Sequence, residues 1–125
     1  MTALAIQRGI AAIFVVLGGW ALIHPASVIG LGLELEYREG AGMHFAVGCF
    51  GAQALIAGLF AATARFTKAT FAGYGLMLVG FLAFDWYFCC VVPVLSPLGA
   101  GIDAAENLAM MALCWLGWRD LRRPG

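Results

Sequence analysis

Four long apolar runs dominate the 125-residue chain and constrain its fold more than any other feature. Each run has roughly the 20 residues that a helix needs to cross a ~30 Å hydrocarbon core. Only helices and closed barrels satisfy their own backbone groups in lipid, and these runs lack the strict alternation of a barrel strand. The sequence therefore predicts one all-α domain over residues 1–125, an integral membrane four-helix bundle with spans at about residues 3–23, 43–62, 70–92 and 98–118.

The composition excludes a water-soluble domain. Hydrophobic residues make up 63% of the chain and charged residues only 11%, against roughly 25% charged in soluble domains. A soluble protein of this size leaves about a third of its chain surface exposed and could not hide so much apolar area. The formal net charge is zero and no basic stripe is present, so we expect the lipid bilayer, and no nucleic acid, as a partner.

Prolines and one serine mark the ends of the expected helices. Pro25 and Pro93 fall where the first and third helices should end, because proline disfavours helix in the residue before it. Ser96-Pro97 has the N-cap and first-position residues of a helix start. The segment from Pro25 to Gly42 is the only long connection, and we expect it at the membrane surface as a short interfacial element.

The basic residues predict the orientation. Six of the seven lie near the start of the first run, in the second loop or after the fourth span, and only Arg38 lies on the other side. This positive-inside bias predicts that both termini are cytoplasmic. We expect the first run to be retained rather than cleaved as a signal peptide, because no small-residue cleavage site follows it. The expected location is the bacterial inner membrane, as a multi-pass protein.

The polar residues Asp85, Asp103, Glu106 and Asn107 lie inside these apolar runs. A carboxylate near the centre of a spanning helix costs roughly 2.5–3.5 kcal/mol, so such groups tend to face a partner, a cavity or a ligand. Asp85 precedes Pro93 by eight residues, which places it ~12 Å inside the outer end of its helix. The other three lie near the outer start of the fourth helix, and His44 opens the second helix on the same side. We therefore expect one ligand-binding site in the outer half.

The positions of these residues around their helices support one site. At 100° per residue, Asp103, Glu106 and Asn107 share one stripe of the fourth helix with Met110, Cys114 and Gly117, while Ala105, Leu108, Ala109, Ala112 and Leu116 lie opposite. The second helix has a smooth face of small residues, where another helix can approach closely, at Gly48, Gly51 and Gly58.

Three interpretations of this site remain open. Its residues could serve only to hold helices together, at ~0.6 kcal/mol per bond, with Asp103 stabilising the positive end of the fourth helix. Alternatively, close carboxyls repel one another when charged, which favours an outward-facing pocket that binds a ligand or handles a proton. His24 and His44 with the carboxylates are possible metal donors, but no ligand spacing supports a metal, so we predict neither metal nor cofactor.

The remaining motifs point to no particular chemistry. All four cysteines lie in the apolar runs without zinc or redox spacing, and we interpret them as small packing residues. No phosphate-binding glycine loop, serine elbow or zinc-protease motif is present. We therefore assign no catalytic residue.

These observations leave three classes of function. We favour a bundle whose polar pocket binds a lipid, a quinone-like or other small apolar molecule, or a partner membrane subunit. The second class is a membrane enzyme with Asp85 and Glu106 as acid and base and with His44 or Asn107 positioning its substrate. The third is a proton-coupled transporter, which would require a homo-oligomer because one four-helix unit is small for a pathway.

In span count and loop pattern, the whole chain resembles small uncharacterised four-helix bacterial membrane proteins such as the DoxX-like group. The likeness is one of layout, and no diagnostic residue motif accompanies it. It implies a four-helix membrane fold and transfers no site residue to this chain.

Overall fold

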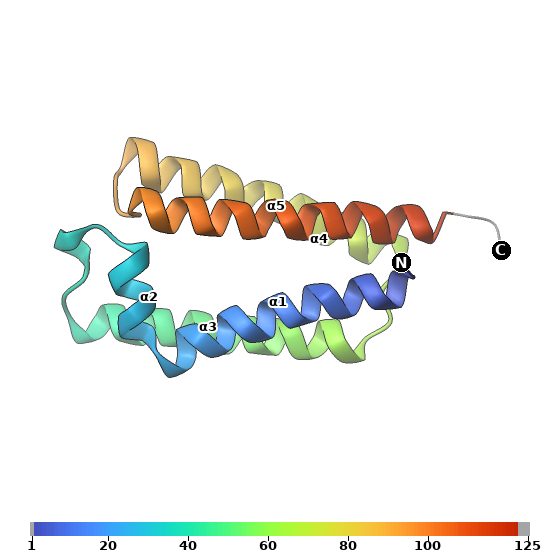
Figure 1. Cartoon of the computed structure of the whole chain (residues 1–125), viewed down its shortest axis with the longest axis horizontal. Coiled ribbons are helices and arrows are strands. Elements are labelled where there is room, and N and C mark those ends of the chain that lie inside the picture. The colour runs from blue at the N-terminus through green and yellow to red at the C-terminus, as the bar shows by residue number, and fades with distance from the viewer. Residues whose placement is uncertain (1, 123–125) are drawn as a thin grey trace.

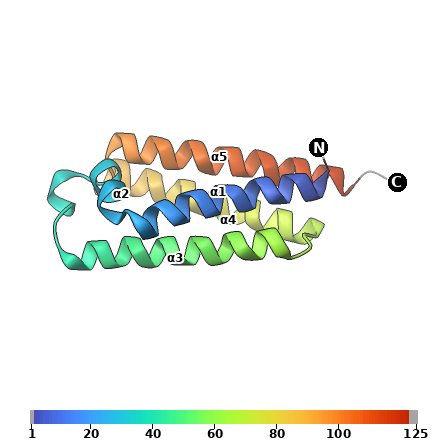
Figure 2. The same ribbon diagram turned by 60° about the horizontal axis from the view of Figure 1, so that its bottom comes forward.

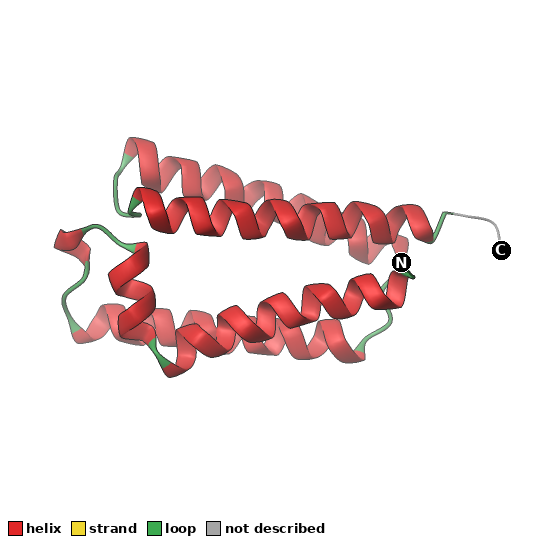
Figure 3. Ribbon diagram, viewed as in Figure 1, coloured by secondary structure: helices red, strands yellow, loops and turns green. Residues whose placement is uncertain are grey.

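The computed structural model describes residues 2–122, and that part of the chain is almost entirely helical (Figures 1 and 3). A 3₁₀ turn at Leu35–Tyr37 follows α2, and a π-helical turn at Tyr87–Val91 continues α4. The only strand-like pairing in the described part is an isolated antiparallel bridge between Leu33 and Leu95. The α-helices are α1 (Ala3–Ile23), α2 (Pro25–Gly32), α3 (Ala41–Thr63), α4 (Lys68–Trp86) and α5 (Pro97–Asp120).

Within the described residues, three helices are long and apolar enough to cross a membrane: α1, α3, and α4 with its π-helical turn. This confirms the prediction of an all-helical chain and supports its expected place in a membrane. The fourth expected span corresponds to α5, which has 24 residues. It does not join the other three, because Asp103, Glu106 and Asn107 lower its mean hydropathy.

The four long helices form two pairs (Figures 1 and 2). Helix α1 packs along α3, and α4 packs along α5, while α1 also contacts α5. The N-terminus and the end of α5 lie together at one end of the molecule, here called the termini end. At the opposite end, here called the α2 end, α2 contacts α1, α3 and α5.

Glycines allow the backbones of α1 and α3 to approach closely. A methyl group at Gly51 would lie 2.5 Å from the backbone nitrogen of Leu22 and 2.7 Å from the carbonyl oxygen of Gly18. One at Gly58 would lie 2.9 Å from a methyl carbon of Val15. These contacts confirm the close approach expected at Gly51 and Gly58, whereas Gly48 faces open space.

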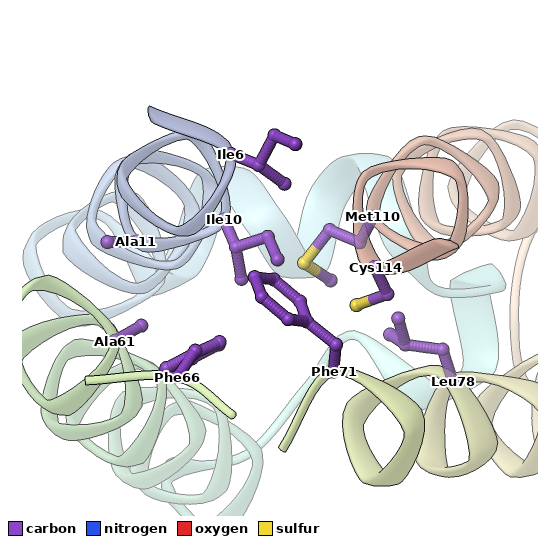
Figure 4. Packing of buried hydrophobic residues seen from close by; sticks show 9 residues of the cluster. All are labelled: Ile6, Ile10, Ala11, Ala61, Phe66, Phe71, Leu78, Met110 and Cys114. Atoms are coloured by element: carbon purple, nitrogen blue, oxygen red, sulfur yellow. The ribbon is translucent and has the colours of Figure 1, made fainter. Parts of the chain in front are cut away.

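The hydrophobic core lies toward the termini end, where all four long helices contribute (Figure 4). The ring of Phe71, at the start of α4, occupies the space that a side chain would need at Gly117 on α5. Core residues almost free of exposure are Ile6, Ile10, Ala61, Phe71 and Met110.

Two polar side chains connect the chain at this same end. The Gln7 amide, 3% exposed, donates to the carbonyl oxygens of Ala61 and Ala64 and accepts from the Phe66 backbone nitrogen. The Asp120 carboxylate accepts a 2.7 Å bond from the backbone nitrogen of Ala3. The first bonds α1 to the α3–α4 connection, and the second bonds the start of α1 to the end of α5.

The helix ends follow the proline and serine signals. The Ser96 hydroxyl caps α5 by accepting from the Gly99 backbone nitrogen at 3.0 Å, with Pro97 as the first helical residue. Pro25 both follows the end of α1 and begins α2. The long connection therefore contains a two-turn helix that the sequence indicated only as an interfacial element.

The α1–α3 approach predicts a sharp difference between two glycines of α3. Gly51→Ala should destabilise the protein by about 1–3 kcal/mol, because its methyl group meets backbone atoms that cannot move aside without separating the helices. Gly48→Ala, with nothing within 4 Å of its added methyl group, is the matched control. Unfolding in mixed micelles monitored by circular dichroism measures both, and equal stabilities would contradict the close approach.

Candidate functional site

The Asn107 side chain joins two carboxylates at the interface of α4 and α5. Its amide nitrogen donates to Asp103 Oδ2 at 3.0 Å and to Asp85 Oδ2 at 3.3 Å. The bond to Asp85 crosses between the helices, whereas the bond to Asp103 stays within α5. Asn107 is 3% and Asp85 is 6% exposed. We call Asp85, Asp103, Glu106 and Asn107 the acidic cluster.

The helical repeat places Asp103, Glu106 and Asn107 on the side of α5 that faces the rest of the protein. Asp103 and Glu106 are half-buried and Asn107 is buried, together with Met110, Cys114 and Gly117 on the same stripe. The opposite side is exposed at Ala105, Leu108, Ala109 and Ala112. The predicted division of this helix into a polar-containing inner face and an apolar outer face is confirmed at these positions. Leu116, also predicted on the outer face, is half-buried and packs against the core.

A seven-residue spacing brings Asp85 to the same interface. The buried residues of α4 are Phe71, Leu78 and Asp85, which are two helical turns apart. Phe71 and Leu78 belong to the hydrophobic core, and Asp85 continues their line toward the α2 end. Asp85 therefore takes the place that a third apolar core residue would occupy.

Glu106 adds a third carboxyl to this stripe. It adjoins Asn107 and lies three residues after Asp103, so both carboxyls of α5 are on one face within a single turn. Every buried side-chain nitrogen and oxygen in residues 2–122 has a hydrogen-bond partner. The cluster is thus rich in acceptors and contains one amide donor for three carboxyl groups.

His44 lies apart from these hydrogen bonds. Its ring is exposed, and Nδ1 lies 3.2 Å from the carbonyl oxygen of Gly40, one turn earlier on its own helix. His24, between α1 and α2, is exposed as well. The structure therefore connects three of the five predicted site residues by hydrogen bonds, places Glu106 beside them, and leaves His44 at the start of α3.

The described residues include no group of three His, Cys, Asp or Glu side chains arranged to hold a metal ion. The side chain that the sequence prediction missed is Gln7, the other buried amide within an apolar run. Its position among apolar residues was the available signal. Gln7 bonds only to backbone groups at the termini end, so its contacts indicate a structural role.

Comparisons with known proteins identified no matching protein-family model, curated protein or solved structure. The resemblance to the DoxX-like group therefore stays a prediction from layout.

The bond between Asp85 and Asn107 predicts a measurable coupling. In a double-mutant cycle of Asp85→Ala and Asn107→Ala, we expect an interaction energy between about 0.6 and 1.7 kcal/mol, the average and the maximum for interhelical bonds in membrane proteins. Unfolding in mixed micelles gives the four stabilities. Leu108→Ala on the exposed face of α5 is the control, and its cycle with Asp85→Ala should be additive. Additivity in the first cycle as well would show that the two side chains act independently.

Proposed function

We propose that this chain is a four-span membrane protein that binds the polar head of a small apolar molecule at the acidic cluster. The head would carry hydrogen-bond donors, as a lipid amine or a quinol-like hydroxyl does. The single observation that carries this proposal is the shared Asn107 amide, which engages Asp85 and Asp103 across the α4–α5 interface. The site would open toward the non-cytoplasmic face of a bacterial inner membrane.

The proposed fourth span is α5. Its 24 residues correspond to about 36 Å of helix, enough for the ~30 Å hydrocarbon core. Its acids lie on the covered face, and its exposed face carries alanine and leucine. A helix of this kind can cross lipid beside other helices although its mean hydropathy is low. An even number of spans also agrees with the two termini lying at one end.

Helix association alone explains only part of the cluster. One bond from Asn107 to Asp85 joins α4 to α5, and that bond needs neither Asp103 nor Glu106. Stabilisation of the helix N-terminus acts within the first turn, whereas Asp103 is the seventh residue of α5. Asp103 and Glu106 therefore raise the free-energy cost of placing α5 in lipid, and among the described residues neither forms an interhelical hydrogen bond that would offset this cost.

The cluster has more hydrogen-bond acceptors than donors, and this excess indicates which groups a ligand would carry. Carboxylates accept hydrogen bonds, and the single amide nitrogen of Asn107 already donates to two of them. A ligand that offers N–H or O–H groups would meet unused acceptor positions. An apolar remainder would lie among the exposed aromatic side chains of α4 nearest Asp85, which include Phe81 and Phe84.

The topology is testable by cysteine labelling in a background without native cysteines. We expect a membrane-impermeant maleimide to label Glu36→Cys in intact cells, and to label Arg65→Cys and Arg122→Cys only after the membrane is disrupted. The expected reason is the excess of basic residues on the side of the termini. Labelling of Arg122→Cys in intact cells, with Arg65→Cys protected, would show that α5 does not cross.

The donor requirement is testable with two lipids that differ in N–H groups. Phosphatidylethanolamine has an ammonium head that donates, whereas the trimethylammonium of phosphatidylcholine cannot. We expect native mass spectrometry to show more phosphatidylethanolamine retained by the wild-type protein. Asp103→Asn and Glu106→Gln should reduce this preference several-fold while the melting temperature in micelles is retained.

Gln53→Ala, a change at an exposed polar position in the middle of α3, is the matched control and should keep the preference. Equal retention of the two lipids by the wild-type protein and both cluster variants would contradict the proposed donor-binding site.

A further inference from the structure

The connection between α1 and α3 lies across the α2 end of the molecule (Figures 1 and 2). We call residues 25–40 the strap. It contains α2 and the 3₁₀ turn, and α2 contacts α1, α3 and α5. The strap is thus the part of the chain that joins the α1–α3 pair to the α4–α5 pair at this end.

Backbone bonds attach the strap to the α4–α5 connection. The Glu34 nitrogen donates to the Val94 oxygen at 2.9 Å, and the Ser96 nitrogen donates to the Gly32 oxygen at 2.9 Å. The Ser96 hydroxyl also donates to the Leu31 oxygen at 2.6 Å. These few bonds lie at the α2 end and involve no residue of the hydrophobic core, so they can break without disturbing that core.

The strap contacts the start of α5, one turn before the stripe that carries the acids. Gly32 lies close to Gly99: a methyl group on Gly99 would lie 2.5 Å from the α-carbon of Gly32. Gly99, Asp103 and Asn107 are spaced four residues apart along α5, so the strap contact lies about 6 Å above Asp103 on the same face. A molecule that enters along this face from the α2 end would meet the strap before the acids.

Besides these bonds, one buried apolar side chain packs α2 against the other helices, and both ends of the strap can act as hinges. Ile29 is the only buried residue of α2 and is 2% exposed. At one end, His24 leaves the helical conformation with φ −129° and ψ 58°. At the other, Gly40 has φ +112°, a value that side chains strongly disfavour. The Trp20 indole also donates to the Ser27 hydroxyl at 2.7 Å, an exposed bond beside the first joint. A short segment with one buried side chain between two non-helical joints is suited to move on those joints.

From these contacts we propose that the strap is a gate, which swings from the α4–α5 connection to admit molecules to the acidic cluster from the α2 end. What it admits rests on the proposed function, but the motion itself is independent of any ligand. In the closed state, the strap bonds and Ile29 cover the approach to Asp103. In the open state, the bridge between Leu33 and Leu95 is broken.

A disulfide can test the gate, because the geometry of the bridge fits one. Leu33 and Leu95 are directly opposed, with the two flanking bonds made by their neighbours. Such a non-hydrogen-bonded pair has α-carbons about 4.5 Å apart, within the range of about 4.4–6.8 Å for disulfides. Leu33→Cys with Leu95→Cys, in a chain whose native cysteines are replaced, should lock the strap on oxidation.

The readout is modification of carboxyls by a water-soluble carbodiimide with a glycine ester, followed by peptide mass spectrometry. We expect Asp103 labelling to be several-fold slower in the oxidised than in the reduced form of the same double variant. Glu36, exposed on the strap, should react equally in both forms and serves as the internal reference. Ile29→Ser in the unlocked protein should accelerate labelling of Asp103.

Equal Asp103 labelling in the oxidised and reduced forms would overturn the gate, since the lock would then not restrict access. Absence of Asp103 labelling in the reduced form would overturn it as well, because the strap would then not open. If the lock slows labelling while the two lipids bind equally, the gate stands and the proposed ligand chemistry fails. If the lipid preference persists while Asp103 is labelled equally in the oxidised and reduced forms, the binding site stands and the gate fails.

Discussion

Lipid offers apolar side chains no advantage in meeting one another, so helices within a membrane need other reasons to stay together. This protein satisfies the constraint in two ways. Between α1 and α3, Gly18, Gly51 and Gly58 remove side-chain bulk and let the backbones come into contact. Between α4 and α5, a buried amide bonds to a buried acid. The two helix pairs thus differ in chemistry, and the polar one contains the proposed site.

The sequence predicted the features that depend on local pattern. Apolar runs predicted the helices, Ser96-Pro97 predicted the start of α5, and the 3.6-residue period assigned the acids of α5 to its covered face. Small residues predicted the α1–α3 contact at Gly51 and Gly58. Each of these signals depends on residues within a few turns of one another, where helix geometry fixes which side chains share a face.

Features that depend on distant contacts were less predictable. His44 was grouped with the acids by depth alone, yet its exposed ring lies against its own helix. Gly48 lies three residues before Gly51 on the same predicted face. A methyl group at Gly48 would nevertheless contact nothing, because α1 ends at Ile23 and does not extend alongside it. The bonds of Gln7 and the bridge between Leu33 and Leu95 join segments more than 50 residues apart. One sequence contains no signal for such pairings.

The position of the hydrophobic core has a consequence for direction. From the acids toward the termini end, α4 and α5 meet through Leu78, Met110, Cys114 and the ring of Phe71 (Figure 4). Among the residues described there, the one buried polar side chain is Gln7, whose amide is fully engaged by backbone groups. A proton or polar molecule at the cluster would therefore meet apolar core side chains on the way to the termini end. In a single copy of the chain, the buried polar side chains described on α4 and α5 therefore end at the cluster and do not continue to the termini end.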